Sequence, residues 1–506
     1  MASGLQLLQV IASAWLWALS MGEGGHAWLA WVALIPLLSA LRGISARRAL
    51  LLGYLAGLGY YLIAFSWITE VGGVRWYDYL LLASYLGIYL ALFGAVCAAA
   101  GARTDYPQVL VTPALWVLME FSWSHAGFLT LPTLIAYSQY QSPLLLQIAS
   151  LTGPYGVSFL IVMVNALGAR LIRGALPSRP EWICVALALC GALGFGTWRL
   201  ATAATSDTLT VAVVQANIPQ ALKWQKEYYR QHLDKHIQLT RDAVEQHDPA
   251  MVIWPESSVP GYFNGFGPSA DVIALGKELG ANLLVGGAGL PKSAESESSA
   301  RSFNAAYLIS QDGSLAGRYY KRHLLPFAEY LPMQDSLPWP ERFTRDRGSF
   351  IPGEEVNTME VDGEPFAVTI CWETLFPDLV RESALAGANL LVNIGNEAWF
   401  GDTAAPHQFF AANVFRAVEN GMSVARSLNS GISGFIDPYG RIVMTVSEND
   451  DETFVAGYAS ASVPIVRERT LYTRHGDLFV FGVAVLVLFF LMRILAMQKQ
   501  PRLLRQ

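Results

Sequence analysis

The stretch PFAVTIC, residues 365–371, is a short and nearly continuous apolar run that ends in a cysteine. A helical pattern near residues 377–386 follows it, and a second apolar run, NLLVNIGN, occupies residues 389–396. Apolar runs of about 4–8 residues bounded by turn residues are typical of strands buried on both faces. The order strand–helix–strand therefore predicts a sheet that helices cover on both sides.

The same alternation extends outward in both directions, from about residue 210 to residue 459. Further strands are expected at residues 210–217, 250–256, 282–287, 303–310, 318–321, 424–427 and 434–436, with helices near 225–246, 269–279 and 407–420. Turn signals at residues 311–313 (QDG) and 437–440 (DPYG) predict hairpins. Hairpins combined with strand–helix–strand units indicate a mixed sheet.

The rest of the chain has a different composition. Hydrophobic residues make up 53% of the 506 residues and charged residues 15%, against about 25% charged in an ordinary soluble domain. The excess of apolar residues lies before residue 200 and after residue 477, which indicates that lipid surrounds these parts. The net charge of −6 argues against a nucleic-acid binder.

A bilayer core requires roughly 20 apolar residues in a helix. Eight such spans are expected, seven before the strand-rich part and one after it. They lie near residues 5–21, 27–41, 50–67, 79–100, 109–128, 151–171, 182–198 and 478–496. The fold class is thus an α+β membrane protein. Its expected parts are a transmembrane domain at residues 1–200, a catalytic domain at 206–462 and a C-terminal transmembrane helix at 477–497.

Arginine residues orient these spans. They gather in the loops at residues 42–48 and 170–179, at Arg103, and in the tail after residue 492. The positive-inside rule places such loops in the cytoplasm, so the strand-rich part is expected on the outer face. A cleaved signal peptide is the alternative for residues 5–21, but that segment has no basic start and further apolar spans follow it directly.

Cysteine usage singles out one residue. Cys97, Cys184 and Cys190 fall within expected spans, where a cysteine is ordinarily a small buried hydrophobic residue. Cys371 is left as the sole cysteine of the strand-rich part. It cannot form a disulfide within that part, so it is either inert or retained for its chemistry.

Reactive side chains follow three expected strands: Glu256 in WPE, Lys321 in YYKRHL, and Cys371 in ICWE. Taken singly, a strand-end glutamate is most often solvated, a lysine in a basic trio faces water, and a buried cysteine is inert. Their occurrence together, in this order and in this sequence context, indicates a catalytic site.

These residues match the Glu–Lys–Cys pattern of the nitrilase superfamily. The motifs QANIPQ with KW (residues 215–224), PFAEYLP (326–332) and NIGNEAWFGD (393–402) resemble the membrane-embedded apolipoprotein N-acyltransferase family in particular. Trp372 stands where that family commonly has tyrosine, and Ala328 where it has glycine. The resemblance implies an α-β-β-α sandwich for the catalytic domain.

The chemistry of the three residues fits acyl transfer. Attack by a thiol requires a base, and Glu256 can take the proton of Cys371. Lys321 favours the thiolate, and it stabilises the oxyanion together with the backbone N–H of Trp372.

Further residues complete the expected site. The resemblance implies that Glu329 is a supporting carboxylate near the acceptor, and Glu373 is expected to hold Lys321 or its loop. Trp224, Trp399 and Phe400 are candidates for substrate contact, although aromatic residues are more often core or membrane-interface residues. No cofactor, metal or nucleotide is expected, because the ligand spacings and glycine-rich loops of such sites are absent from the sequence.

The resemblance implies a reaction at the bacterial inner membrane, with the catalytic domain on the periplasmic face. A phospholipid such as phosphatidylethanolamine would donate its sn-1 acyl chain to Cys371. The α-amine of a diacylglyceryl-cysteine apolipoprotein would then accept it. Two alternatives remain open at this point: a membrane-tethered amidase or nitrilase that uses water, and a carrier that has lost catalysis.

Overall fold

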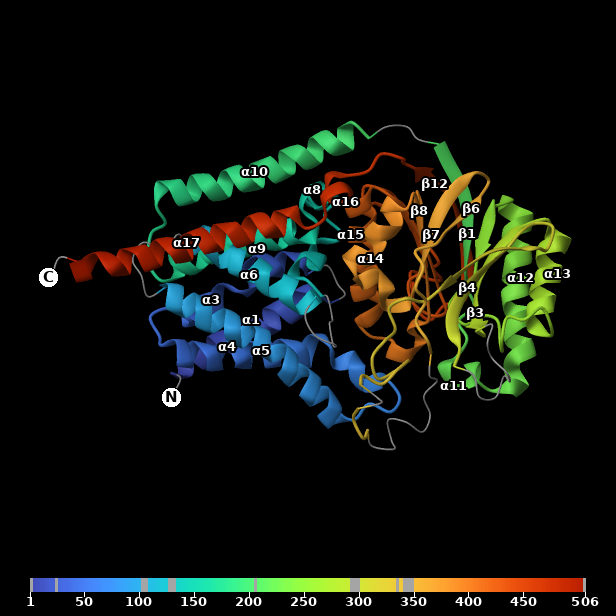
Figure 1. Ribbon diagram of the computed structural model, residues 1–506, viewed down its shortest axis with the longest axis horizontal. Helices are drawn as coiled ribbons and strands as arrows, with labels where there is room; N and C mark the ends of the chain where they lie inside the picture. The colour runs from blue at the N-terminus through green and yellow to red at the C-terminus, as the bar shows by residue number, and fades with distance from the viewer. Residues whose placement is uncertain are drawn as a thin grey trace. The chain divides into compact units, whose positions relative to one another are not determined.

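The structure is a computed structural model that describes residues 3–22, 26–101, 108–125, 133–203, 207–291, 301–333, 336–339 and 350–503. The chain divides into two compact units (Figure 1). The helical unit comprises Met1–Ala203 and His475–Gln506, and the sheet unit comprises Ala204–Arg474. Each unit is described by itself below.

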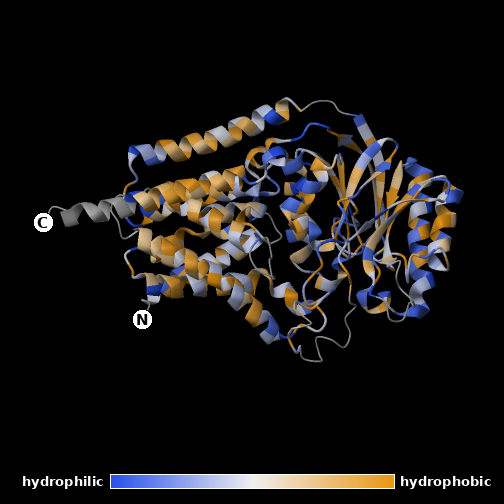
Figure 2. Cartoon of the chain, viewed as in Figure 1, coloured by the Kyte–Doolittle hydropathy of each residue, from blue (hydrophilic) through white to orange (hydrophobic). Residues whose placement is uncertain are grey.

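The helical unit is built from apolar helices, which are mostly orange in Figure 2. Three described helices are long and apolar enough to cross a bilayer: α5 (Trp76–Gly101), α9 (Pro154–Ile172) and α10 (Arg179–Ala201). The other described helices of this unit are α1 (Gly4–Ser20), η1 (Ala27–Leu29), α2 (Ala30–Ala33), α3 (Ile35–Ala40), α4 (Ala46–Ala64), η2 (Ser66–Glu70), α6 (Gln108–His125), η3 (Ile135–Gln139), α7 (Pro143–Leu146), α8 (Ala149–Thr152) and α17 (Leu478–Leu503).

The expected count of eight spans is not confirmed. The second expected span is divided among η1, α2 and α3, each far shorter than the roughly 20 residues that a bilayer requires. The fifth expected span corresponds to α6, which contains Pro113 and the fully buried Glu120. Residues 126–128 of that span, and Arg103 of the expected inner loop, lie outside the described residues.

Glycines allow two of these helices to approach closely. A Cβ atom on Gly53 of α4 would lie 2.3 Å from the Leu90 carbonyl oxygen of α5, and one on Gly57 would lie 2.9 Å from the Gly87 Cα. Small residues at such crossings let two backbones pack directly, which is the main source of helix association in lipid. The α4–α5 pair therefore depends on glycine rather than on interlocking large side chains.

The sheet unit contains two six-stranded sheets in its described residues. The first sheet has the order β12-β1-β2-β3-β4-β5 and the second β11-β10-β9-β8-β7-β6. The strands are β1 (Asp207–Gln215), β2 (Met251–Ile253), β3 (Asn282–Gly289), β4 (Phe303–Ile309), β5 (Leu315–Tyr320), β6 (Thr358–Val361), β7 (Glu364–Ile370), β8 (Leu390–Gly395), β9 (Ser423–Leu428), β10 (Gly434–Ile436), β11 (Ile442–Thr445) and β12 (Gly457–Ile465).

Helices cover the outer face of each sheet, so the unit has four layers. In Figure 1, α12 and α13 lie on one side of the paired sheets and α14 and α15 on the other. The helices and short turns of this unit are α11 (Gln220–Lys223), η4 (Lys226–Tyr228), α12 (Tyr229–His247), α13 (Pro268–Leu279), η6 (Cys371–Leu375), α14 (Pro377–Leu385), η7 (Glu397–Phe400), α15 (Ala405–Asn420) and α16 (Leu471–His475). The expected α-β-β-α sandwich is therefore present.

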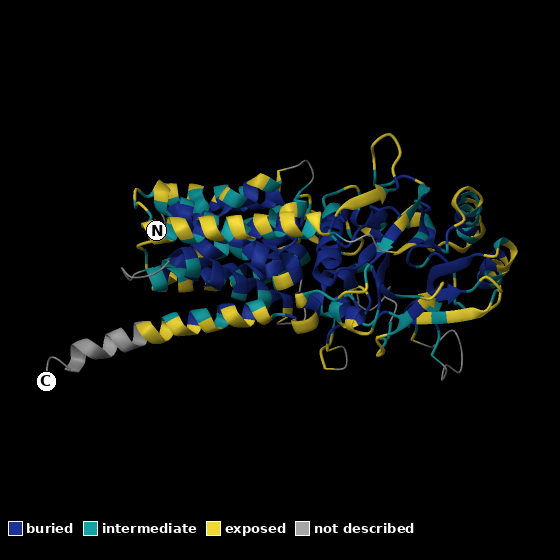
Figure 3. Ribbon diagram, turned by 90° about the horizontal axis from the view of Figure 1, so that it is seen from above, coloured by how far each residue is buried: buried dark blue, intermediate teal, exposed yellow. Residues whose placement is uncertain are grey.

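Burial of both faces explains why the strands are continuous apolar runs. Val211 and Val213 of β1 pack between the two sheets, whereas Ala212 and Val214 face the layer of α12 and α13. Successive side chains of a strand point to opposite faces, so a strand covered on both sides needs apolar residues at every position. Figure 3 shows the interior strands of this unit largely in the dark blue of buried residues.

A polar contact also joins the sheets. The Ser427 hydroxyl of β9 lies 3.0 Å from the Val214 carbonyl oxygen and 2.9 Å from that of Ile253, both in the first sheet. The hairpins and strand–helix–strand units predicted mixed strand pairing, and both sheets are mixed. Each has parallel strands at its centre and antiparallel strands at its edges.

Candidate active site

Cys371 lies where β7 ends and the short helix η6 begins. Its φ angle is +59°, in the left-handed region that residues other than glycine rarely adopt. Such a conformation costs on the order of 1–3 kcal/mol and persists where the surrounding structure enforces it, often at functional sites. The backbone thus turns sharply at the nucleophile candidate.

Lys321 and two carboxylates lie at the ends of strands in the other sheet. The Lys321 ammonium, buried just after β5, is 2.9 Å from each carboxylate oxygen of Glu329. It is 4.0 Å from the nearer oxygen of Glu256, which follows β2. Both carboxylates are largely buried, so they form a compact charged cluster.

Asn304 of β4 links these two carboxylates. Its side-chain amide donates to Glu256 Oε1 at 2.6 Å and to Glu329 Oε1 at 3.0 Å. The sequence interpretation missed Asn304, because it sits inside an apolar strand with no motif around it. Its only signal is a polar residue at a position where the pattern of β4 requires burial.

The electrostatic setting determines the resting protonation states. Burial and the negative charge of Glu256 raise the pKa of the Cys371 thiol, although Lys321 opposes the shift. Burial also raises the pKa of Glu256, and here too Lys321 acts in the opposite direction. Burial alone would lower the pKa of Lys321, but the surrounding negative groups, Glu329 foremost, raise it above its ordinary range.

The resting site therefore holds a neutral thiol beside a permanent ammonium. Lys321 does favour the thiolate, as expected, but its effect is smaller than that of burial. A free thiolate is not the ground state at neutral pH. The thiol proton has to move to a base during attack. Glu256 lies farther from the Lys321 ammonium than Glu329 does, which makes it the candidate base.

Glu373 anchors the loop that carries Lys321. Its carboxylate accepts hydrogen bonds from the backbone N–H groups of Arg322, His323 and Ile370 at 2.7–2.9 Å. It also accepts from the Tyr319 hydroxyl at 3.0 Å. Glu373 is fully buried, and it ties the end of β5 to the start of η6. It thus sets the position of Lys321 relative to Cys371 without contacting either side chain in these bonds.

The aromatic candidates divide into buried and exposed residues. Trp372 is buried, and its indole donates to the His323 carbonyl oxygen at 2.7 Å, so its side chain supports the same loop. Phe400 is buried and stacks on Phe409. Trp224 and Trp399 have exposed fractions of 54% and 40%, which leaves their rings available to a ligand.

A small pocket adjoins the backbone of Glu256. Lys223, which is buried, donates to the Glu256 carbonyl oxygen at 3.1 Å, and burial lowers the pKa of Lys223 to about 8. Lys223, Trp224 and His236 are among the residues that line the pocket. The motif at residues 215–224 contained Lys223, but the sequence did not predict its hydrogen bond to the backbone of Glu256.

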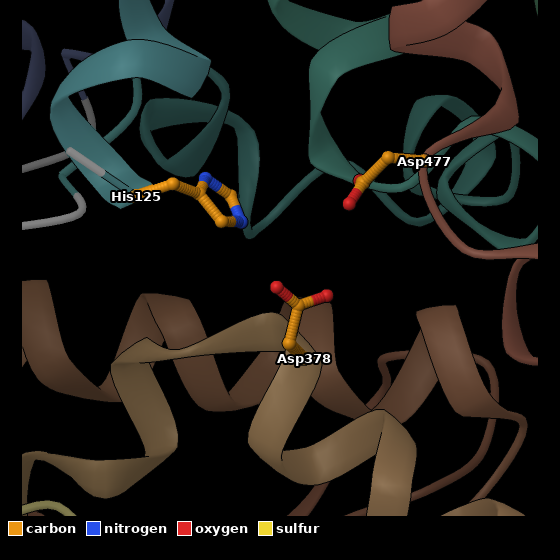
Figure 4. A group of neighbouring side chains, drawn as sticks. All are labelled: His125, Asp378 and Asp477. Atoms are coloured by element: carbon orange, nitrogen blue, oxygen red, sulfur yellow. The ribbon is translucent and has the colours of Figure 1, made fainter.

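Figure 4 draws His125, Asp378 and Asp477, a histidine and two aspartates of the kind that bind metals. His125 and Asp477 belong to the helical unit and Asp378 to the sheet unit, so they are not side chains of one compact unit. No metal site is assigned to them, and the absence of a metal cofactor stays a prediction.

Two family models match parts of this chain, and solved structures are similar to its sheet unit. The family model described as apolipoprotein N-acyltransferase N-terminal domain matches residues 13–167, and that of carbon-nitrogen hydrolase matches residues 210–466. The yeast protein Nit3, a nitrilase superfamily member of solved structure, is 20% identical, with a TM-score of 0.38. The match covers 51% of this chain and 91% of Nit3.

Two relatives are similar along most of their length. The apolipoprotein N-acyltransferase of Geobacter metallireducens is 33% identical over 94% of this chain and 92% of its own. That of Methylococcus capsulatus is 32% identical over 83% of both chains. A family model that covers half of the sequence and relatives that cover 83–94% of it establish that this chain belongs to the apolipoprotein N-acyltransferase family of the nitrilase superfamily.

Proposed function

We propose that the chain transfers an acyl chain from a phospholipid to the N-terminal amine of a diacylglyceryl-cysteine apolipoprotein, through a thioester on Cys371. The observation that carries this proposal is that Glu256 and Lys321, which follow strands of one sheet, act on the pKa of Cys371 at the end of a strand of the other sheet, Glu256 raising it and Lys321 lowering it. A nucleophile, a base and a permanent cation are the groups that acyl transfer requires.

In the first half-reaction, Cys371 Sγ attacks the sn-1 ester carbonyl carbon of the phospholipid while Glu256 takes the thiol proton. The carbonyl oxygen becomes an oxyanion, which Lys321 and the Trp372 N–H stabilise. The ester C–O bond then breaks, and Glu256 returns the proton to the leaving glycerol oxygen. The products are an acyl thioester and a lysophospholipid.

In the second half-reaction, the α-amine of the apolipoprotein attacks the thioester carbonyl carbon. Glu256 accepts a proton from the amine, and the same donors stabilise the second oxyanion. The C–S bond breaks and the thiolate of Cys371 recovers the proton. The resting state, with a neutral thiol and an ionised Glu256, is restored.

The close Lys321–Glu329 pair supports different roles for Glu256 and Glu329. Glu329 holds the ammonium at 2.9 Å, whereas Glu256 lies 4.0 Å from it. Both oxygens of Glu329 also accept hydrogen bonds, one from the Asn304 amide and one from the Leu325 N–H. We therefore assign Glu256 as the base and Glu329 to orienting Lys321 near the acceptor.

Both substrates carry acyl chains that lie in lipid, which accounts for the apolar helical unit. Three of its described helices are long and apolar enough to span a bilayer. We place the protein in the bacterial inner membrane, with the sheet unit on the periplasmic face, on the distribution of arginine residues described above.

The test is a single-turnover reaction of the purified full-length protein in detergent with phosphatidylethanolamine. Intact-protein mass spectrometry should detect an acyl adduct in the wild type and none in Cys371→Ala. Addition of a diacylglyceryl-cysteine peptide should then discharge the adduct and yield an N-acylated peptide. An adduct that persists in Cys371→Ala would rule out the thioester.

The same experiment distinguishes the proposed transferase from an amidase or nitrilase that uses water. An enzyme that uses water would lose its adduct in the absence of peptide, and free fatty acid would accumulate at the rate of discharge. The transferase should keep the adduct over that time. A wild type that never acquires an adduct from any phospholipid would contradict the proposed donor.

A further inference from the structure

A buried polar network lies directly behind Cys371, on the neighbouring strands of its sheet. Asn393 of β8 and Arg426 of β9 are paired in register, and both are at most 1% exposed. The Asn393 side-chain amide donates to the Cys371 carbonyl oxygen at 3.2 Å. None of the residues assigned to the reaction above belongs to this network.

Arg426 fixes which way the Asn393 side chain faces. Its Nε donates to Asn393 Oδ1 at 3.1 Å. Because a guanidinium only donates hydrogen bonds, it requires the oxygen of Asn393 on its own side. The NH₂ group of Asn393 then faces β7, where it donates to the Cys371 carbonyl oxygen and also to the carbonyl and hydroxyl oxygens of Thr369 at 3.3 and 3.2 Å.

Arg426 is itself held on two further sides. Its guanidinium donates to Glu397 Oε1 and to the Ile432 carbonyl oxygen, the latter at 3.0 Å. Glu397 is buried and supplies the negative charge that Arg426 needs in this interior. A Cβ atom on Gly431 would lie 2.0 Å from Glu397 Oε2, so the site has no room for a larger residue there.

The consequence for the reaction comes from the geometry of the peptide bond. The Cys371 carbonyl and the Trp372 N–H belong to one planar trans peptide, so they point in opposite directions. A hydrogen bond that fixes the carbonyl therefore fixes the direction of the N–H. As the second residue of η6, Trp372 has an N–H without an intrahelical acceptor, which leaves it available to an oxyanion.

We propose that Asn393, oriented by Arg426 and Glu397, is a positioning residue that aims the Trp372 N–H at the oxyanion formed on acylation of Cys371. The network also counteracts relaxation of the left-handed Cys371 backbone. This inference rests on the proposed function only in that Cys371 forms an acyl adduct. It does not depend on the identity of donor or acceptor.

The test compares two reactions of the same thiol in the full-length protein. Acylation by a small 4-nitrophenyl ester passes through an oxyanion, whereas alkylation by iodoacetamide does not. In Asn393→Ala and in the isosteric Asn393→Asp, the acylation rate should fall by about 10²–10³, the loss typical of one oxyanion donor. The alkylation rate should stay within a few-fold of the wild type.

Asn389→Ala is the matched control. Asn389 immediately precedes β8, is also buried, and donates to Glu364 at 3.2 Å. Its loss should leave both rates unchanged, because it lies at the other end of the strand. Thermal unfolding of each variant reports whether it is folded, and Arg426→Lys gives a further probe, since lysine cannot bridge Asn393 and Glu397 in the same way.

Equal losses in acylation and alkylation would overturn the proposal, because they would indicate a structural role alone. Unchanged acylation in both Asn393 variants would overturn it as well. A wild type that is acylated by the nitrophenyl ester but never by a phospholipid would contradict the proposed function and leave this inference standing.

Discussion

The Lys321 ammonium lies 2.9 Å from Glu329 but 4.0 Å from Glu256, so the two carboxylates are not equivalent. Among the negative groups around Lys321, Glu329 raises the pKa of the ammonium most, and its charge also raises the pKa of Glu256 in addition to the larger effect of burial. The base form of Glu256 is therefore lost, as the pH falls, at a higher pH than for an ordinary glutamate.

We expect Glu329→Gln to move the acid limb of Cys371 acylation to lower pH. The substitution removes the charge that raises the pKa of Glu256 and frees Lys321 to lower it. The measurement is the single-turnover acylation rate as a function of pH, fitted separately for the wild type and the variant. An acid limb that stays in place or moves to higher pH would show that Glu256 is not the titrating base.

Glu256→Gln and Lys321→Met should change the thiol in opposite directions. Glu256 raises the pKa of Cys371 and Lys321 lowers it. Iodoacetamide at neutral pH should therefore label Glu256→Gln faster than the wild type and Lys321→Met more slowly. Acylation by an ester should nevertheless fall in both, by about 10²–10⁴ without the base and about 10²–10³ without the oxyanion donor.

The opposite labelling order would mean that the two charges have been assigned the wrong effect on Cys371. Asn389→Ala serves again as the control, since it changes no charge. Ester acylation at the wild-type rate in Glu256→Gln would mean that another carboxylate is the base.

Glu373→Gln should lower the free energy of unfolding, although glutamine has nearly the same shape as glutamate. The carboxylate accepts hydrogen bonds from the Tyr319 hydroxyl and from three backbone N–H groups. A glutamine presents an NH₂ group to at least one of these donors, and a buried donor left unpaired costs about 1–3 kcal/mol. Denaturant unfolding should detect this loss, whereas Glu382→Gln, on the exposed side of the Arg322 ion pair, should show almost none.

The arginine distribution predicts the topology. Reporter fusions near Asp450 should behave as exported proteins, and fusions after Arg505 should behave as cytoplasmic ones. The paired enzymes alkaline phosphatase and β-galactosidase give opposite signals for the two locations. The reverse pattern would place the sheet unit in the cytoplasm and contradict the proposed substrate.

The sequence predicted the strand ends that carry Glu256 and Cys371 because an apolar run stops abruptly at each one, and it predicted the strand that carries Lys321 from the hairpin turn at residues 311–313. It also predicted helices on both faces, since β1 and its neighbours have no polar side to expose. The apolar runs alone did not predict the division of strands between two sheets, which only the family resemblance implied. That division depends on which strands pair with one another. Apolar runs of similar length give no indication of their pairing partners.

Residues that act through long-range contacts were also missed. Asn304 is 48 residues from Glu256 in sequence, and nothing near it marks the contact. Lys223 stood in a recognised motif, but its bond to the Glu256 carbonyl depends on how α11 packs. The count of eight spans is not confirmed for a related reason: apolar composition does not reveal where a segment such as residues 27–40 breaks into short helices.

The two-sheet origin of the site has a consequence for synthesis of the protein. A chain that has emerged as far as β11 already holds every strand of the sheet that carries Cys371. The sheet that carries Glu256 and Lys321 still lacks β12, which pairs with all nine residues of β1. The strands around the thiol are therefore synthesised before the last strand of the sheet that holds its proton acceptor, so we expect the complete site to form only after β12 has been added.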